Sequence, residues 1–174
     1  MIKVFLACLT LAAALLQVSL PFAYLPVDFV FLVVVFTGLQ RGRGAGLAMG
    51  VIGGLALDAL VSPRLGPRLV SLAMTGALAD FLYYSVNREQ PRLQLLGAAA
   101  LSLFHDLALF WCAAALQLSQ GGGRRFLFDY ALPRLALHAV LVVPSYFVFR
   151  AMVRARVFQD PLTRPPTVIR KLPR

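Results

Sequence analysis

Six long apolar segments, each ended by glycine, proline or charged residues, constrain this chain more than any other feature of its sequence. They cover residues 4–20, 26–40, 45–61, 69–86, 93–118 and 130–152. Each is continuous and rich in Leu and Ala, and most approach the roughly 20 residues that a helix needs to cross a bilayer. Apolar residues fill 60% of the 174 positions and charged residues only 14%, a balance that is not typical of water-soluble domains. The sequence therefore predicts an all-α integral membrane protein, a compact bundle of about six transmembrane helices.

The two ends of the chain differ in character. The first apolar segment follows Lys3 and resembles a signal peptide, but residues 22–24 make a poor cleavage site, so we interpret it as a retained helix. Residues 1–152 are predicted to form one transmembrane domain. Residues 153–174 are rich in proline, arginine and lysine, which indicates a basic, disordered tail.

The distribution of lysine and arginine predicts the orientation. With six spans and a cytoplasmic N-terminus, twelve of the 17 basic residues lie on the inner side and five on the outer side. We therefore expect a multi-pass protein of the bacterial inner membrane with both termini in the cytoplasm. The second segment is short and follows two prolines; if it does not cross, five spans result and only Lys3 changes side. The net charge of +10 then indicates a role in topology and contact of the basic loops and tail with anionic lipids or, alternatively, contact of the tail with a cytoplasmic partner, and not binding of nucleic acid.

The third segment carries a glycine at every fourth position. Gly46, Gly50 and Gly54 share one face of the predicted helix, and Gly53 lies beside the last of them. Small residues at this spacing let two helix backbones approach closely. The face is predicted to pack against another helix of the chain or, alternatively, to receive a partner's transmembrane helix. Asp58, one turn beyond Gly54, is expected near the outer interface, within reach of water or a partner, where it either accepts hydrogen bonds from a neighbouring helix end or loop or simply ends the helix.

Ionisable residues inside the apolar segments are candidate functional groups, because an unpaired charge in lipid is costly. His105 and Asp106 lie at the middle of the fifth segment. A short loop predicts that the last two helices are antiparallel neighbours, so Asp106 is expected to contact His138 or Arg134. Structural pairing inside the bundle is favoured over a proton or substrate path. Asp28 is interpreted as the N-cap of the second helix. The predicted intramembrane polar cluster consists of Asp80, His105, Asp106, Arg134 and His138.

Motifs of soluble enzymes are missing from the sequence. It contains no GxSxG nucleophile elbow, no HExxH zinc helix and no Walker loop. Cys8 and Cys112 both lie in apolar stretches without a CxxC partner, which is typical of buried hydrophobic side chains. We therefore predict no catalytic residue, no metal ligand and no cofactor.

One stretch of the chain resembles a known family. A Pro-x-Asp opens the second helix, an Arg-Gly ends it, a glycine-rich helix ending in Leu-Asp follows, and a Pro and Leu-Gly turn comes next. These features are Pro26-Val27-Asp28, Arg41-Gly42, Gly46 to Leu57-Asp58, and Pro63-Arg64-Leu65-Gly66. This pattern is similar to the rod shape-determining protein MreD family of bacterial inner membranes, although Val27 separates a Pro and an Asp that are usually adjacent there.

The resemblance implies a non-enzymatic scaffold of the cell-elongation machinery. Its expected direct partner is the single-span protein MreC, with weaker ties to the filament protein MreB and to the peptidoglycan synthases RodA and penicillin-binding protein 2. The family is also similar in fold to the substrate-binding subunits of energy-coupling-factor transporters, which gives an alternative function in small-molecule uptake. Those subunits usually carry an Ala-x-x-x-Ala face on the first helix, whereas here Leu11 follows Ala7. An intramembrane enzyme, the third class considered, would have to use His105, Asp106 and His138.

Overall fold

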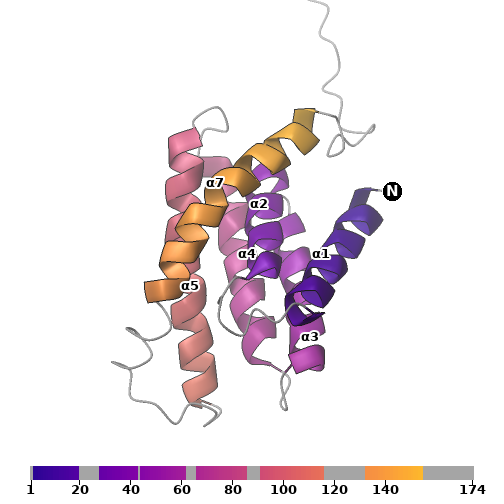
Figure 1. Ribbon diagram of the computed structural model, residues 1–174, viewed down its shortest axis with the longest axis vertical. Helices are drawn as coiled ribbons and strands as arrows, with labels where there is room; N and C mark the ends of the chain where they lie inside the picture. Colours follow the sequence, from indigo (N-terminus) through magenta and orange to yellow (C-terminus); the bar gives the residue numbers. More distant parts are fainter. Residues whose placement is uncertain are drawn as a thin grey trace, which may run out of the picture.

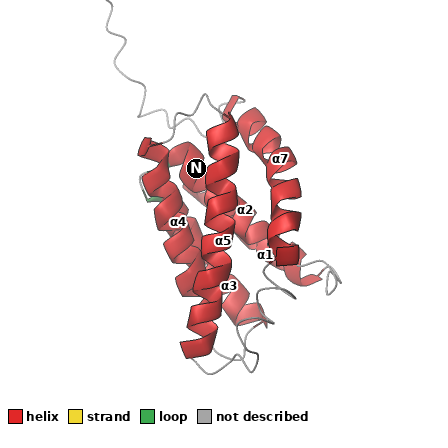
Figure 2. Ribbon diagram, turned by 90° about the vertical axis from the view of Figure 1, so that its left-hand side faces the viewer, coloured by secondary structure: helices red, strands yellow, loops and turns green. Residues whose placement is uncertain are grey.

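The computed structural model describes residues 2–19, 28–42, 44–61, 66–85, 91–115 and 132–154, and every secondary-structure element within them is an α-helix (Figure 1, Figure 2). The helices are α1 (Ile2–Ser19), α2 (Phe29–Arg41), α3 (Ala45–Val61), α4 (Pro67–Ser85), α5 (Pro91–Ala115) and α7 (Leu132–Arg154). One helix thus lies in each of the six apolar segments, and the all-helical prediction is confirmed. From residue 155 onward the expected basic tail lies outside the described residues.

Local sequence determines both ends of α2. Asp28 has an extended backbone, with φ −108°, and its carboxylate accepts a hydrogen bond from the Phe31 N–H at 2.9 Å, which confirms the predicted N-cap. At the other end Gly42 has φ 56°, a left-handed conformation, and its N–H donates to the carbonyl oxygen of Gly38 at 2.8 Å. Glycine adopts this conformation without steric cost, so the chain can leave the helix here.

Helix α2 is the central helix of the described bundle. Every residue from Val30 to Leu39 is buried, and the helix contacts α1, α3, α4, α5 and α7 (Figure 1). Its 13 residues are fewer than a lipid-facing span requires. Because protein covers its sides, however, the thickness of the bilayer does not fix its length. The shortness of the second segment is therefore explained by a central position in the bundle.

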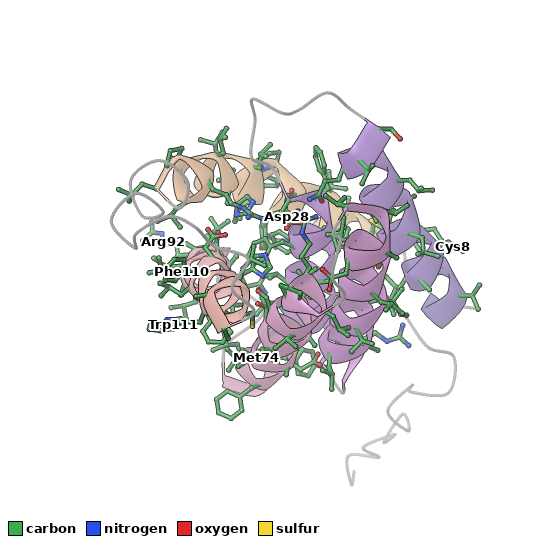
Figure 3. The ribbon with its side chains drawn as sticks, turned by 90° about the horizontal axis from the view of Figure 1, so that it is seen from below. Cys8, Asp28, Met74, Arg92, Phe110 and Trp111 are labelled. Carbon is green, nitrogen blue, oxygen red and sulfur yellow. The ribbon has the colours of Figure 1, made fainter. Side chains whose placement is uncertain are left out.

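Many polar side chains lie inside the described bundle, together with its apolar core, and many other large apolar side chains face outward. Asp28 sits among the helices in Figure 3, whereas Cys8, Met74 and Trp111 lie at the periphery. Leu96, Val140 and Phe147 are more than 60% exposed. The fully or almost fully buried polar residues are Thr10, Asp28, Thr37, Asp58, Ser71, Thr75, Asp80, Gln94, Ser102, His105, Asp106, Arg134 and His138. This arrangement suits a protein whose solvent is hydrocarbon.

Length and composition identify two described stretches that are long and apolar enough to cross a membrane. These are Arg92–Cys112 in α5 and Leu132–Met152 in α7, both with a mean hydropathy of 1.6. Three shorter apolar helices accompany them, at Val4–Ser19, Phe29–Arg41 and Ala45–Val61. The fold is therefore a helical bundle with at least two candidate membrane spans.

Candidate functional site

The glycine face of α3 packs against α4. A Cβ atom added at Gly46 would lie 2.6 Å from the carbonyl oxygen of Gly76, and one added at Gly54 would lie 2.5 Å from the Cα of Leu69. At Gly50 it would collide with the carbonyl group of Leu72. All three obstacles are backbone atoms, which a rotamer change cannot remove. The structure therefore places this face inside the chain, against another of its own helices.

Gly53 serves a different contact from the other three glycines of α3. A Cβ at Gly53 would meet the side chains of Val30 in α2 and Thr10 in α1. At the opposite end of α3, the Cα of Gly38 in α2 would lie 2.8 Å from a Cβ at Gly46. The glycines thus allow α3 to approach α4 along one face, and α1 and α2 along another.

Asp58 and Asp80 join α3 and α4 at opposite ends. The Asp58 carboxylate accepts hydrogen bonds from the N–H groups of Gly66, Arg68 and Leu69, at 2.9, 3.2 and 2.9 Å, at the beginning of α4. The Asp80 carboxylate accepts them from Gly46 and Leu47, both at 3.0 Å, at the beginning of α3. Each aspartate satisfies N–H groups that have no partner within their own helix.

These contacts correct two expectations from the sequence. Asp58 is 0% exposed, so it lies inside the α3–α4 pair and not at an accessible outer interface. Asp80 bonds the first turn of α3 and is not part of the group around His105. Asp28, which the sequence identified only as an N-cap, takes its place beside Asp106 in that group.

Arg134 of α7 lies between two buried carboxylates. Its Nη2 atom is 2.7 Å from Oδ2 of Asp28, and its Nε atom is 3.3 Å from Oδ1 of Asp106. The expected approach of Asp106 to Arg134 is therefore observed. The three side chains come from the beginning of α2, the middle of α5 and the first turn of α7, and none of the three residues is more than 6% exposed. We call Asp28, His105, Asp106, Arg134 and His138 the buried charge cluster.

Two histidines that both contact Phe31 complete the buried charge cluster. The ring of His138 stacks on Phe31 with an interplanar angle of 6°, and the His105 ring centroid lies 5.3 Å from that of Phe31. The Nδ1 atom of His138 is 2.6 Å from the hydroxyl of Ser102, and that of His105 is 2.7 Å from the hydroxyl of Ser71. The Asp28 N–H donates to Nε2 of His138 at 3.2 Å. Side chains from α2, α4, α5 and α7 thus meet in one group.

Sequence reasoning missed the serine partners and the glycine of α4. Ser102 precedes His105 by three residues, so the two share a helix face, and this spacing was the available signal. Gly76 is the one glycine of α4, and Ser71 is one of several small residues in that helix, so neither residue indicates a particular partner. Asp28 stands 106 residues from Arg134, a separation across which a local pattern predicts no pairing.

The serine–histidine–aspartate order within the buried charge cluster raises the question of hydrolytic chemistry. Ser71, His105 and Asp28 follow one another at 2.7 and 3.5 Å. However, the Ser71 hydroxyl donates to the carbonyl oxygen of His105 at 2.9 Å, and Ser71 is 0% exposed. A nucleophile must reach its substrate, so this geometry favours the pairing of buried polar groups over attack on an external bond. Within the described residues no group of three or more His, Cys, Asp or Glu side chains could hold a metal ion.

Comparison with known proteins identifies a family. The family model of rod shape-determining protein MreD matches residues 1–156, which is most of the chain and includes all the helices described above. No curated protein and no solved structure matches the chain. The family has a role in determining rod shape, and its members are bacterial membrane proteins. A bundle with apolar outer faces and buried polar groups fits such a protein, and the chain belongs to the rod shape-determining protein MreD family.

Proposed function

We propose that the chain is a non-enzymatic scaffold of the bacterial cell-elongation complex, which helps to couple cytoskeletal filaments to peptidoglycan synthesis. The observation that carries the proposal is the distribution of polar groups. Asp28, Asp58, Asp80 and Arg134 contact groups of the same chain and are buried. Because side chains of this kind hold the bundle together, the outer surface is available to bind other proteins.

A partner inside the bilayer would have to meet apolar helix faces. Phe5 on α1, Phe81 on α4, Leu96 on α5 and Val140 on α7 are between 44% and 69% exposed. A single-span protein can pack a helix against such a face through van der Waals contact. We therefore propose MreC as the direct partner, with weaker or indirect association of MreB and of the peptidoglycan synthases RodA and penicillin-binding protein 2. In this proposal the chain crosses the inner membrane six times, and both of its termini lie in the cytoplasm.

The alternative, a substrate-binding subunit of a small-molecule transporter, is less well supported. It rests on the fold similarity that the family resemblance implies, and no contact in the bundle favours it. The backbones of α3 and α4 touch at Gly46, Gly50 and Gly76, which leaves no room for a ligand along this pair. The two functions differ in the partners that they require.

Site-specific photo-crosslinking in living cells tests the scaffold proposal. A photoreactive amino acid replaces Phe5, Phe81, Leu96 or Val140, one on each of four outer helices, and Leu57, which is 0% exposed, serves as the buried control. We expect a crosslink to MreC from at least one outer position and none from position 57. If no outer position crosslinks to MreC, or if purification instead recovers a pair of ATPases, the scaffold proposal is wrong.

A further inference from the structure

The fixed charges of the buried charge cluster do not balance. Asp28 and Asp106 contribute two negative charges, and Arg134, at 2.7 and 3.3 Å from them, contributes one positive charge. All three lie in the interior, with exposures of 4%, 1% and 6%. An uncompensated charge in such surroundings is costly. One additional proton on a member of the cluster would make the whole cluster neutral.

His138 does not hold this proton. Its Nε2 atom accepts the hydrogen bond from the Asp28 N–H at 3.2 Å, so that nitrogen carries a lone pair. Its hydrogen is then on Nδ1, which donates to the Ser102 hydroxyl oxygen at 2.6 Å. A ring with one donor and one acceptor nitrogen is neutral.

His105 has partners that suit a proton on both ring nitrogens. The Ser71 hydroxyl lies 2.9 Å from the carbonyl oxygen of His105 and 2.7 Å from its Nδ1 atom. When the hydroxyl donates to the carbonyl oxygen, its lone pairs face Nδ1 and accept from that nitrogen. On the other side, Nε2 lies 3.5 Å from the Asp28 carboxylate, which attracts a protonated nitrogen and repels a lone pair. Two such neighbours favour a proton on each nitrogen, and a ring with two donor nitrogens is positively charged.

Asp106 is the competing carrier of the same proton. Neither of its carboxylate oxygens has a hydrogen-bond partner within the described residues, and burial works against its charged form. The Arg134 Nε atom at 3.3 Å favours a negative charge on this side chain. The proton is assigned to His105 because an oxygen faces each of its two ring nitrogens, and a proton on Asp106 would leave His105 neutral.

We propose that the buried charge cluster is a proton-binding site, in which His105 holds one exchangeable proton that keeps α7 packed on α2 and α5. The groups around His105 are Asp28 and Phe31 from α2, Ser71 from α4, Asp106 from its own helix, and Arg134 and His138 from α7. Without the proton the cluster has one excess negative charge, which water must solvate. Water reaches it when α7, which supplies Arg134 and His138, moves away from its neighbours.

Nitrogen NMR of the whole protein in lipid nanodiscs measures the proton directly. The chain has only two histidines, so selective ¹⁵N-histidine labelling yields two rings, which His138→Gln assigns. At neutral pH we expect His105 to show two protonated nitrogens and His138 one, on Nδ1. Asp106→Asn removes one negative charge, so His105 should then become neutral. A neutral His105 in the unaltered protein overturns the proposal, as does a charged His105 in Asp106→Asn.

Thiol labelling in detergent micelles tests the effect on α7. In a Cys8→Ser, Cys112→Ser background, Val142→Cys places a thiol at a position that is 2% exposed, and Val140→Cys provides the control at 69%. His105→Gln should speed labelling at position 142 about tenfold, the change expected for loss of one interaction with a charged group, and leave position 140 unchanged. Adding Asp106→Asn to His105→Gln should restore slow labelling, because the charges balance again. Equal rates at position 142 with and without His105→Gln, or no reversal by Asp106→Asn, overturn the proposed role of the proton.

Discussion

Asp58 and Asp80 show how single residues keep polar groups satisfied inside this bundle. Each carboxylate lies at the first turn of the neighbouring helix and accepts two or three backbone N–H groups there. The N-terminus of a helix carries a partial positive charge, so an acidic side chain is favoured at that position. In hydrocarbon these N–H groups have no water to bond. The two aspartates therefore replace the solvent at both ends of the α3–α4 pair.

Replacing either aspartate by alanine leaves buried N–H groups without an acceptor. For Asp58→Ala and Asp80→Ala we expect the free energy of unfolding to fall by about 1–3 kcal/mol each. Asp58→Asn should lose less, because the amide oxygen still accepts a hydrogen bond. The measurement is unfolding in detergent micelles followed by circular dichroism. The two alanine effects should add, since the residues act at opposite ends of the pair; wild-type stability in Asp58→Ala would contradict this account.

At the scale of the residue, the sequence predicts contacts between residues that are close in the chain. It misses contacts between residues that are far apart in the chain. The N-cap of α2 was predictable, because Asp28 and the Phe31 N–H are three residues apart. Asp80 was recognised as a buried ionisable residue, but its partners Gly46 and Leu47 lie 34 and 33 residues away. Periodicity identifies the face of a helix on which a residue lies and not the element that it meets. Asp80 was therefore assigned to the wrong group.

At the scale of the element, α3 is shaped by the glycines on two of its faces. Gly46 and Gly50 bring its backbone against that of α4, while Gly53 admits side chains from α1 and α2. The four-residue spacing predicted a close helix contact. It did not identify α4 as the neighbour, because α4 contributes only one glycine, Gly76, to the contact. A single glycine in an apolar helix is not a pattern.

Alanine substitutions at two glycines compare a close helix contact with ordinary packing. Gly50→Ala places a Cβ against the carbonyl group of Leu72, whereas a Cβ at Gly97 in α5 would lie 3.7 Å from its nearest neighbour, the Cδ1 of Leu82. We expect Gly50→Ala to lower the free energy of unfolding by about 1–3 kcal/mol. Gly97→Ala should have no cost or add up to about 1 kcal/mol, because alanine favours helix. Thermal unfolding of both variants in the same detergent measures the difference, and equal stability would show that α3 and α4 are not in close contact.

At the scale of the whole molecule, the bundle consists of outer helices around α2. The composition was sufficient to predict that the chain is a membrane protein made of helices. It was not sufficient to predict the central position of α2, since a short apolar helix in protein and one in lipid have similar sequences. The burial of Val30–Leu39 on all sides decides between these environments, and only tertiary contacts reveal it.

The orientation of the whole chain gives a prediction that labelling can test. In a cysteine-free background, Lys3→Cys and Thr163→Cys introduce one thiol near each end. We expect neither to react with a membrane-impermeant maleimide in intact spheroplasts, and both to react after the membrane is permeabilised, because twelve of the 17 basic residues then lie on the inner side. Reaction at position 3 in intact spheroplasts, with protection at position 163, would establish an odd number of crossings.

The buried charge cluster also has a consequence for the synthesis of the protein. Asp28 is made early, but Arg134 and His138 follow it by 106 and 110 residues. Until α7 has left the ribosome, the carboxylates of Asp28 and Asp106 lack their guanidinium, and the bundle cannot close around them. A chain that stops before Leu132 therefore lacks the guanidinium that pairs with Asp28 and Asp106. Within the described bundle, charge pairing is completed only when α7 has been made.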